Sequence, residues 1–362
     1  MIRRLISTFI EWNPSNLSHS DFFQQNQIIP NLFTDKKLEH LNWLHDSAPA
    51  FPVKANKIQV ISEPQQFYDT VLEKSANAKK RIVLASLYLG IGKLETDLVN
   101  AIQQNLKKNV SLEVNILLDY TRGTRGIVNS KTMLMPLIQQ SDNCNLSLYH
   151  TPALRGITKK LAPSRWNELL GLQHMKLYLF DDTVIMSGAN LSNDYFSNRQ
   201  DRYIVVEDRR LANFFTNFIA KVQEFSMKVD RDGEVNLHDS WKLSPYQSPH
   251  VDFALEAKKR IQSFFHTTYE EQKSLTDEIA IADTWVFPTM EMGQLKIHHD
   301  SIVTKKLLAT SPKGSTLKMA TGYFNLTGSY MDSIVKECEA DCSIIMAHPN
   351  VRYFNCVDWK CY

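Results

Sequence analysis

The chain has 362 residues, which is long for one compact domain, so two lobes of ordinary size are expected. Its 43% hydrophobic and 22% charged residues exclude a disordered chain, and a net charge of +2 excludes a general nucleic-acid binder. Because no run of about 18 apolar residues appears, we expect membrane contact to be peripheral.

Residues 1–53 are polar and weakly patterned, and we treat them as an N-terminal extension. The first twelve residues, MIRRLISTFIEW, contain two arginines, interleaved apolar residues and no acid before Glu11. This pattern fits a short amphipathic mitochondrial presequence, and it fits an ordinary surface helix equally well.

Strands and helices alternate from Ile58 onward, which predicts a layered α/β domain over residues 54–229. The apolar run at 81–89 is typical of a strand buried on both faces. The predicted strands are 58–62, 81–89, 111–120, 145–150, 174–180, 183–189 and 201–207, and the predicted helices are 64–78, 94–106, 131–140 and 209–229.

The pattern recurs after a predicted linker at 230–250. LKMATGYFN at 317–325 parallels IVLASLYLG at 82–90, and each is followed by a helical stretch and another apolar strand. We therefore predict a second, incomplete copy of the α/β unit over 251–350, followed by a divergent tail at 351–362. Four cysteines near this end do not follow zinc-site spacing, so we expect reduced thiols and no metal.

Chemistry concentrates in the segment GLQHMKLYLFDDTVIMSGANLS at 171–192. His174 and Lys176 are two positions apart on a predicted strand, so both side chains should share one face. A buried imidazole and ammonium side by side are costly unless they meet an anion, and a phosphodiester would supply one. His174 could attack phosphorus while Lys176 holds a non-bridging oxygen.

Three further polar residues follow this pair. Asp181 closes the strand off the catalytic face, where we expect it to orient a neighbour or form an ion pair. Asn190 follows a run of small residues and could donate its amide to a phosphate oxygen. Asp201 begins the next strand, where its carboxylate could fix a histidine tautomer.

Two basic segments are weaker candidates. Asp119, Arg122 and Arg125 lie in a turn after a strand and could grip a substrate phosphate, although a solvated basic turn accounts for them equally well. A second segment mixes basic and apolar residues and could rest on anionic lipid or be an ordinary surface loop. Its basic residues are Arg155, Lys159, Lys160 and Arg165.

The spacing H-x-K-x4-D-x6-G-x-N resembles the phospholipase D superfamily signature, with Ala189 where the superfamily usually has serine. Longer stretches resemble the eukaryotic mitochondrial phosphatidylglycerophosphate synthases. These stretches are ASLYLGIG (85–92), LLDYTRGTRG (117–126), HTPALRG (150–156), RWNELLGLQHMKLYLFDDTVIMSGANLS (165–192), YFSNRQDRY (195–203), DTWVFPTMEMG (283–293) and TGYFNLTGSYMD (321–332).

This resemblance implies a phospholipase-D-like α/β sandwich, with His174, Lys176 and Asp181 as catalytic residues and Asn190 and Asp201 as phosphate-binding or supporting residues. It implies transfer of a phosphatidyl group from CDP-diacylglycerol to sn-glycerol 3-phosphate through a phosphohistidine, with no metal cofactor. It also implies a peripheral location at the mitochondrial inner membrane and allows a homodimer. A contact with ATP or another nucleotide is a weaker expectation, at Ala85, Ser86, Tyr88, Gly90 and Gly92.

The superfamily site uses two such motifs, and this sequence contains one. We therefore expect a chain truncated at its C-terminal end relative to the family. Two alternatives to the transferase stay open: a phosphodiesterase that uses water as acceptor, and an inactive or regulatory form that lacks the second motif.

Overall fold

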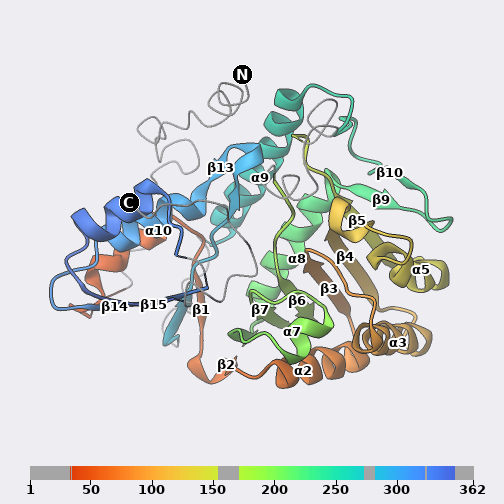
Figure 1. The fold of residues 1–362 in the computed structure, drawn as a ribbon, viewed down its shortest axis with the longest axis horizontal. Coiled ribbons are helices and arrows are strands. Elements are labelled where there is room, and N and C mark those ends of the chain that lie inside the picture. The colour runs from red at the N-terminus through yellow and green to blue at the C-terminus, as the bar shows by residue number, and fades with distance from the viewer. Residues whose placement is uncertain (1–32, 34, 154–170, 273–281, 323, 347–362) are drawn as a thin grey trace, which may run out of the picture. The chain divides into compact units, whose positions relative to one another are not determined.

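The computed structural model describes residues 33, 35–153, 171–272, 282–322 and 324–346, which fall into two compact units (Figure 1). The larger unit covers Pro49–Pro288 and Met292–Ile297, and the smaller one covers the rest of the chain. The predicted presequence, the basic residues at 155–165 and the predicted tail lie outside the described residues.

The larger unit alternates strands and helices as the sequence predicts. Its elements in chain order are β1 (Phe51–Val53), η4 (Ala55–Lys57), β2 (Ile58–Ile61), α2 (Pro64–Asn77), β3 (Arg81–Ser86), α3 (Lys93–Lys108), β4 (Glu113–Asp119), α4 (Tyr120–Gly123), α5 (Ser130–Gln140), β5 (Cys144–Tyr149), β6 (Leu177–Phe180), β7 (Thr183–Met186), α7 (Asn193–Ser197), β8 (Tyr203–Glu207), α8 (Arg209–Glu224), β9 (Met227–Val229), β10 (Val235–Leu237), α9 (His250–Gln272), β11 (Thr284–Val286) and η7 (Gly293–Leu295).

The described strands of the central sheet follow the order β10-β9-β5-β4-β3-β6-β7-β8-β2. β3, β4 and β5 run parallel because α3 and α5 carry the chain back between them. β6, β7 and β8 follow as an antiparallel meander, with Ile82 of β3 opposite Phe180 of β6. The sheet is therefore mixed, and the α/β fold expected from the sequence is confirmed.

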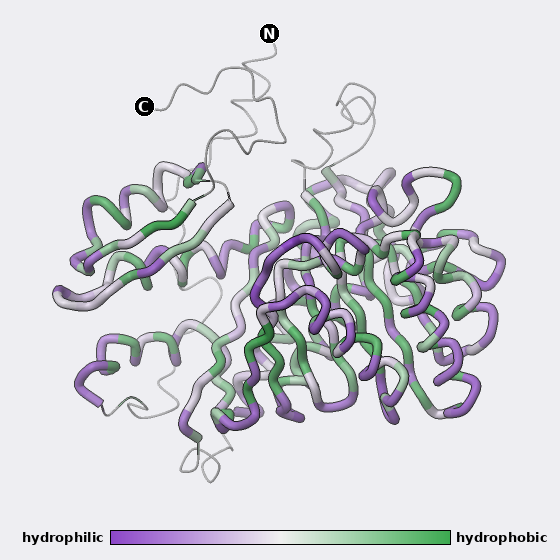
Figure 2. The backbone as a smooth tube through the Cα atoms, turned by 60° about the horizontal axis from the view of Figure 1, so that its bottom comes forward, coloured by the Kyte–Doolittle hydropathy of each residue, from purple (hydrophilic) through white to green (hydrophobic). Residues whose placement is uncertain are grey.

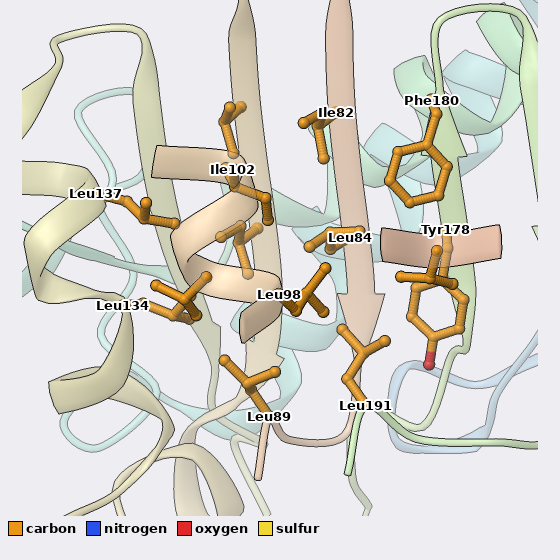
Figure 3. Packing of buried hydrophobic residues seen from close by; sticks show 14 of the residues in the cluster. Ile82, Leu84, Leu89, Leu98, Ile102, Leu134, Leu137, Tyr178, Phe180 and Leu191 are labelled. Atoms are coloured by element: carbon orange, nitrogen blue, oxygen red, sulfur yellow. The ribbon is translucent and has the colours of Figure 1, made fainter. Parts of the chain in front are cut away.

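Helices cover both faces of this sheet. Figure 3 shows Ile82, Leu84, Tyr178 and Phe180 pointing to the face on which α3 lies. Leu98 of α3 and its neighbours pack against them, and α2, α5 and α7 complete that layer. α8 contacts β5, β6 and β7 from the other face. Figure 2 shows the hydrophobic colour following the strands, as expected for a sheet buried on both sides.

Several element boundaries differ from those predicted. The predicted helix at 209–229 ends at Glu224, and Met227–Val229 forms β9 instead. The predicted linker contains β10, which pairs with β9 across a turn where Gly233 has a φ of 83°. In the sequence this hairpin resembles a linker, because it contains turn-forming residues such as Asp230 and Gly233. α9, expected in the second copy, belongs to the larger unit.

The smaller unit contains η3 (Glu39–Asp46), α10 (His299–Ala309), β14 (Thr316–Thr321), α11 (Gly328–Asp332), the π-helical turn η8 (Ser333–Glu337) and β15 (Asp341–Met346), and the short strands β12 (Glu291–Met292) and β13 (Ile297–His298) span the boundary between the units. β14 and β15 pair in parallel, with Leu317 opposite Cys342. The β14–helix–β15 order matches β3–α3–β4, which agrees with the predicted recurrence. The His299 ring is buried in this unit and bonded to the Ser47 carbonyl oxygen at 2.6 Å.

Candidate active site

One edge of the larger unit's sheet collects most of the predicted site residues. β3, β4, β5 and β7 run in one direction, so their carboxyl ends meet the amino ends of β6 and β8 at this edge. The edge is where open α/β sheets bind ligands. Ser86 ends β3, Asp119 ends β4, and Asn190 follows β7. His174 and Lys176 come just before β6, and Asp201 comes just before β8.

The His-x-Lys pair lies in the segment that leads into β6, because the strand begins at Leu177 and not at His174 as predicted. The Lys176 side chain is only 8% exposed, whereas His174 is exposed to solvent. The Lys176 ammonium donates to the His174 carbonyl oxygen at 2.8 Å. Burial lowers the pKa of Lys176 to about 8, although the nearby Asp201 carboxylate acts to raise it. The site thus holds a desolvated ammonium beside an accessible imidazole.

A hydrogen-bonded cluster holds Asn190 at the same edge. The Tyr178 hydroxyl donates to the Ala189 carbonyl oxygen at 2.6 Å and lies 3.5 Å from the Ser86 hydroxyl. Ser86 in turn lies 3.5 Å from the Asn190 side-chain oxygen. Asn190 is 2% exposed, so its amide is fixed by burial as well as by these partners. Tyr178 was not predicted from the sequence, although its position two residues after Lys176 on an apolar strand was a usable signal.

Gly188 makes room for Asp201. A Cβ atom at position 188 would lie 2.6 Å from Asp201 Oδ2, closer than side chains tolerate. The backbone N–H of Arg202 donates to the other carboxylate oxygen at 2.7 Å. This pair of constraints fixes the carboxylate that acts electrostatically on Lys176. The expected bond from Asp201 to a histidine stays a prediction.

Asp181 lies at the opposite end of β6 from His174, in the β6–β7 turn, with a φ of 52°. Its carboxylate accepts backbone N–H groups of Lys79 at 2.9 Å, Lys80 at 2.7 Å and Arg81 at 3.1 Å. Burial acts to raise the pKa of Asp181, but these bonds outweigh it and the pKa falls below its usual range. The structure therefore places Asp181 as an anchor for the start of β3.

Asp119 supports the segment that carries His174. It caps α4, accepting from the Arg122 N–H at 3.0 Å and from the Thr121 hydroxyl at 2.6 Å. Its second oxygen accepts the Gln173 backbone N–H at 3.2 Å, one residue before His174. Burial raises the pKa of Asp119 despite these bonds. A link between the end of β4 and the segment that carries His174 was not visible in the sequence.

The segment 85–92, expected to contact a nucleotide, is tied to residues around Asn190. Tyr88 OH and Ser192 Oγ lie 3.3 Å apart, and the Gly90 N–H donates to the Leu191 carbonyl oxygen at 2.8 Å. Ala85 and Ser86 are fully buried in β3. The nucleotide contact stays a prediction.

Glu95 is a buried acid that was not predicted from the sequence. It is 2% exposed, and its Oε1 atom accepts the Asn193 N–H at 2.6 Å. A Cβ atom at Gly90 or Gly92 would collide with this carboxylate, so both glycines leave space for it. Glu95 therefore joins the start of α3 to the start of α7, next to the turn that carries Asn190.

Comparisons with known proteins identify relatives of this chain. A family model described as "Cardiolipin synthase, PLD-like domain" matches residues 71–222. The mitochondrial CDP-diacylglycerol–glycerol-3-phosphate 3-phosphatidyltransferase of Homo sapiens is 39% identical over 344 residues, covering 88% of this chain and 62% of the relative. The corresponding transferase of Saccharomyces cerevisiae is 36% identical, covering 84% of this chain and 60% of the relative. The chain is therefore similar to these phosphatidyltransferases over most of its own length.

A solved structure supports the fold. Phosphatidylserine synthase of Haemophilus influenzae matches with a TM-score of 0.56 at 19% identity, covering 86% of this chain and 66% of that one. The chain spans about 62% of the length of the curated relatives it matches first. Among the described residues, no helix is long and apolar enough to cross a membrane, and no group of acidic, histidine and cysteine side chains is placed to hold a metal ion.

Proposed function

We propose that the protein transfers a phosphatidyl group from CDP-diacylglycerol to sn-glycerol 3-phosphate, giving phosphatidylglycerophosphate and CMP. The observation that carries the proposal is the gathering of His174, Lys176, Asn190 and Asp201 at one sheet edge in a relative of these transferases. A buried ammonium and a fixed amide offer two cationic or polar donors to one phosphodiester.

The reaction runs in two displacements. The exposed His174 imidazole attacks the phosphorus attached to diacylglycerol, a P–N bond forms, and the bond to CMP breaks. The glycerol 3-phosphate hydroxyl then attacks the same phosphorus, and the P–N bond to His174 breaks. The hydroxyl loses its proton to solvent or a base in this step. Lys176 and Asn190 neutralise and orient the phosphoryl oxygens in both steps. These donors supply the charge stabilisation, so no metal is assigned to the chemistry.

Substrate location follows from the same proposal. CDP-diacylglycerol carries two acyl chains and stays in the bilayer, so the enzyme works at a membrane surface. Several relatives are named as mitochondrial, and we assign this protein a peripheral position on a mitochondrial membrane, with the inner membrane as the specific expectation.

Product analysis with and without glycerol 3-phosphate tests the proposal. Without glycerol 3-phosphate, the purified protein should release no more than one CMP per active site, and it should turn over repeatedly and form phosphatidylglycerophosphate only when glycerol 3-phosphate is present. Formation of phosphatidic acid at the same rate without the acceptor would show a phosphodiesterase instead. Absence of any product from a folded protein would show an inactive form.

A further inference from the structure

Two loops beside the candidate active site expose apolar side chains. Ile91 is 53% exposed in the β3–α3 loop, and Ile127 and Val128 are 96% and 56% exposed in the loop before α5. We call these three residues the apolar lip. Single exposed apolar residues are ordinary, so the exposure acquires meaning only from where the residues lie and what surrounds them.

The apolar lip lies at the sheet edge that carries the site. The β3–α3 loop and the loop before α5 both follow carboxyl ends of neighbouring parallel strands. They are joined to each other, because the Ser130 hydroxyl donates to the Leu89 carbonyl oxygen at 2.6 Å and accepts its N–H at 3.0 Å. The Arg122 guanidinium also lies 5.1 Å from the centre of the Tyr88 ring.

The loop that carries Ile127 is held in a fixed shape. Gly126 adopts a φ of 89°, which L side chains rarely adopt, and its carbonyl oxygen accepts the Asn129 side-chain amide at 2.8 Å. Asn129 also forms a capping box with Thr132 at the start of α5. The exposure of Ile127 is therefore built into an ordered turn.

The charge around the apolar lip is positive. No aspartate or glutamate occurs between Tyr120 and Ser141. The two acids nearest to these loops in sequence, Asp119 and Glu95, are each 2% exposed. Arg125 is exposed, and no ion pair forms with it among the described residues. Apolar side chains on a basic rim match an anionic lipid surface, where acyl chains lie beneath phosphate groups.

We propose that the apolar lip enters an anionic bilayer and that Arg125 binds lipid phosphate, so that the His174 edge of the sheet faces the membrane. This inference rests on the proposed function, because a bilayer-resident substrate gives the exposed apolar side chains beside His174 their role. The diacylglycerol chains can then stay in the bilayer while the phosphodiester reaches Lys176.

Vesicle binding tests the inference with Ile127→Asp, and Val110→Asp serves as matched control. Val110 is 85% exposed at the opposite edge of the sheet, between α3 and β4. On vesicles of phosphatidylcholine and phosphatidylglycerol, Ile127→Asp should weaken binding roughly tenfold or more. Val110→Asp should leave binding unchanged. Arg125→Gln should weaken binding roughly fivefold on vesicles that contain phosphatidylglycerol. It should have no effect on binding to vesicles of pure phosphatidylcholine.

Turnover separates this inference from the proposed function. Ile127→Asp should lower kcat/KM on CDP-diacylglycerol in vesicles, but it should match the unmodified protein on a short-chain, monomeric substrate. Equal vesicle binding by both variants would overturn the inference, as would equal losses on both substrates. A change in oligomeric state caused by Ile127→Asp without vesicles would also overturn it and assign the lip to a second copy of the chain. If no protein turns over the short-chain substrate, the proposed function fails while the binding comparison still stands.

Discussion

Lys176 is the residue on which the proposed chemistry depends most closely. An ammonium that is only 8% exposed is costly to keep charged, and its pKa is lowered to about 8 for that reason. A bound phosphodiester would favour the charged form again, so substrate binding and the charge of Lys176 are coupled. The sequence predicted this residue because a histidine and a lysine two positions apart on an apolar strand are costly to bury unless an anion lies beside them.

The pH dependence of turnover tests this description of Lys176. Since the ammonium is lost as the pH rises through the pKa of about 8, kcat/KM should fall on the alkaline side near that pH. In Lys176→Arg the alkaline fall should move to a higher pH, because arginine stays charged, even if the maximum rate is lower. A kcat/KM that stays level well above pH 8 in the unmodified protein would contradict the assignment.

The pH dependence of folding stability tests the lowered pKa of Lys176 independently of turnover. The pKa of Lys176 is about 8 in the folded protein and 10.5 for a free side chain, so the unfolded chain binds more protons between these values. Stability should therefore rise with pH across that window, by an amount that is lost in Lys176→Met. Urea unfolding at several pH values measures the slope.

The residues that could not be predicted from the sequence are those that hold neighbouring segments of the site in place. Tyr178, Glu95 and Gln173 have no motif, and their roles depend on strand pairing and on contacts between distant segments. Asp181 shows the reverse case. The motif names it as catalytic, whereas its contacts are backbone N–H groups at the start of β3.

At the scale of elements, Asp181 tests whether the β6–β7 turn holds the edge of β3 in place. Asp181→Ala removes three accepted N–H bonds, so it should lower the free energy of unfolding by about 1–2 kcal/mol. Because the pKa is lowered in the folded state, this contribution is present above the unfolded pKa and disappears as the pH falls through the folded one. Turnover per folded molecule should change little.

Asp182→Ala is the matched control for that substitution. Asp182 pairs with Lys80 and Arg81 at 3.8 and 3.5 Å on a side chain that is 41% exposed, so its loss should cost less than about 0.5 kcal/mol. A large loss of kcat per folded molecule in Asp181→Ala would show that Asp181 has a direct role in the chemistry.

Gly188 connects the β7–α7 turn to the site. Gly188→Ala places a Cβ 2.6 Å from Asp201 Oδ2, which the carboxylate can escape by rotating away. We expect a small change in thermal stability and roughly a tenfold or greater loss of kcat/KM, because Asp201 then no longer faces Lys176. Gly328→Ala, where the new Cβ meets nothing within 4 Å, is the control and should leave kcat/KM unchanged. An active Gly188→Ala protein would show that the position of Asp201 does not matter.

The order of strands and helices along the larger unit could be predicted because buried strands and amphipathic helices differ in their hydrophobic period. The hairpin of β9 and β10 could not, since short edge strands joined by Asp230 and Gly233 look like a polar linker. The predicted start of β6 at residue 174 was also wrong, because pairing with Ala85 and Met186 begins only at Leu177.

At the scale of the molecule, the sequence revealed a recurring strand–helix–strand step but not how the chain divides. The β14–β15 pair is parallel, as the β3–β4 pair is. α9 belongs to the larger unit, although its position in the sequence placed it in the predicted second copy. The helix buries Phe253, Ile261 and Phe265. Contacts between residues more than 200 positions apart, such as Gln272 with Ala50, carry no local signal.

The proposed mechanism depends on His174 forming a covalent bond to the phosphatidyl group. The most direct measurement uses CDP-diacylglycerol labelled at the phosphate next to diacylglycerol, with acid-labile label on the protein trapped before acceptor is added. We predict that label is found on His174, that it is absent from His174→Asn, and that it persists in His238→Asn, which alters a half-buried histidine whose ring lies 2.9 Å from the Ser240 hydroxyl. Label that survives in His174→Asn would contradict the mechanism.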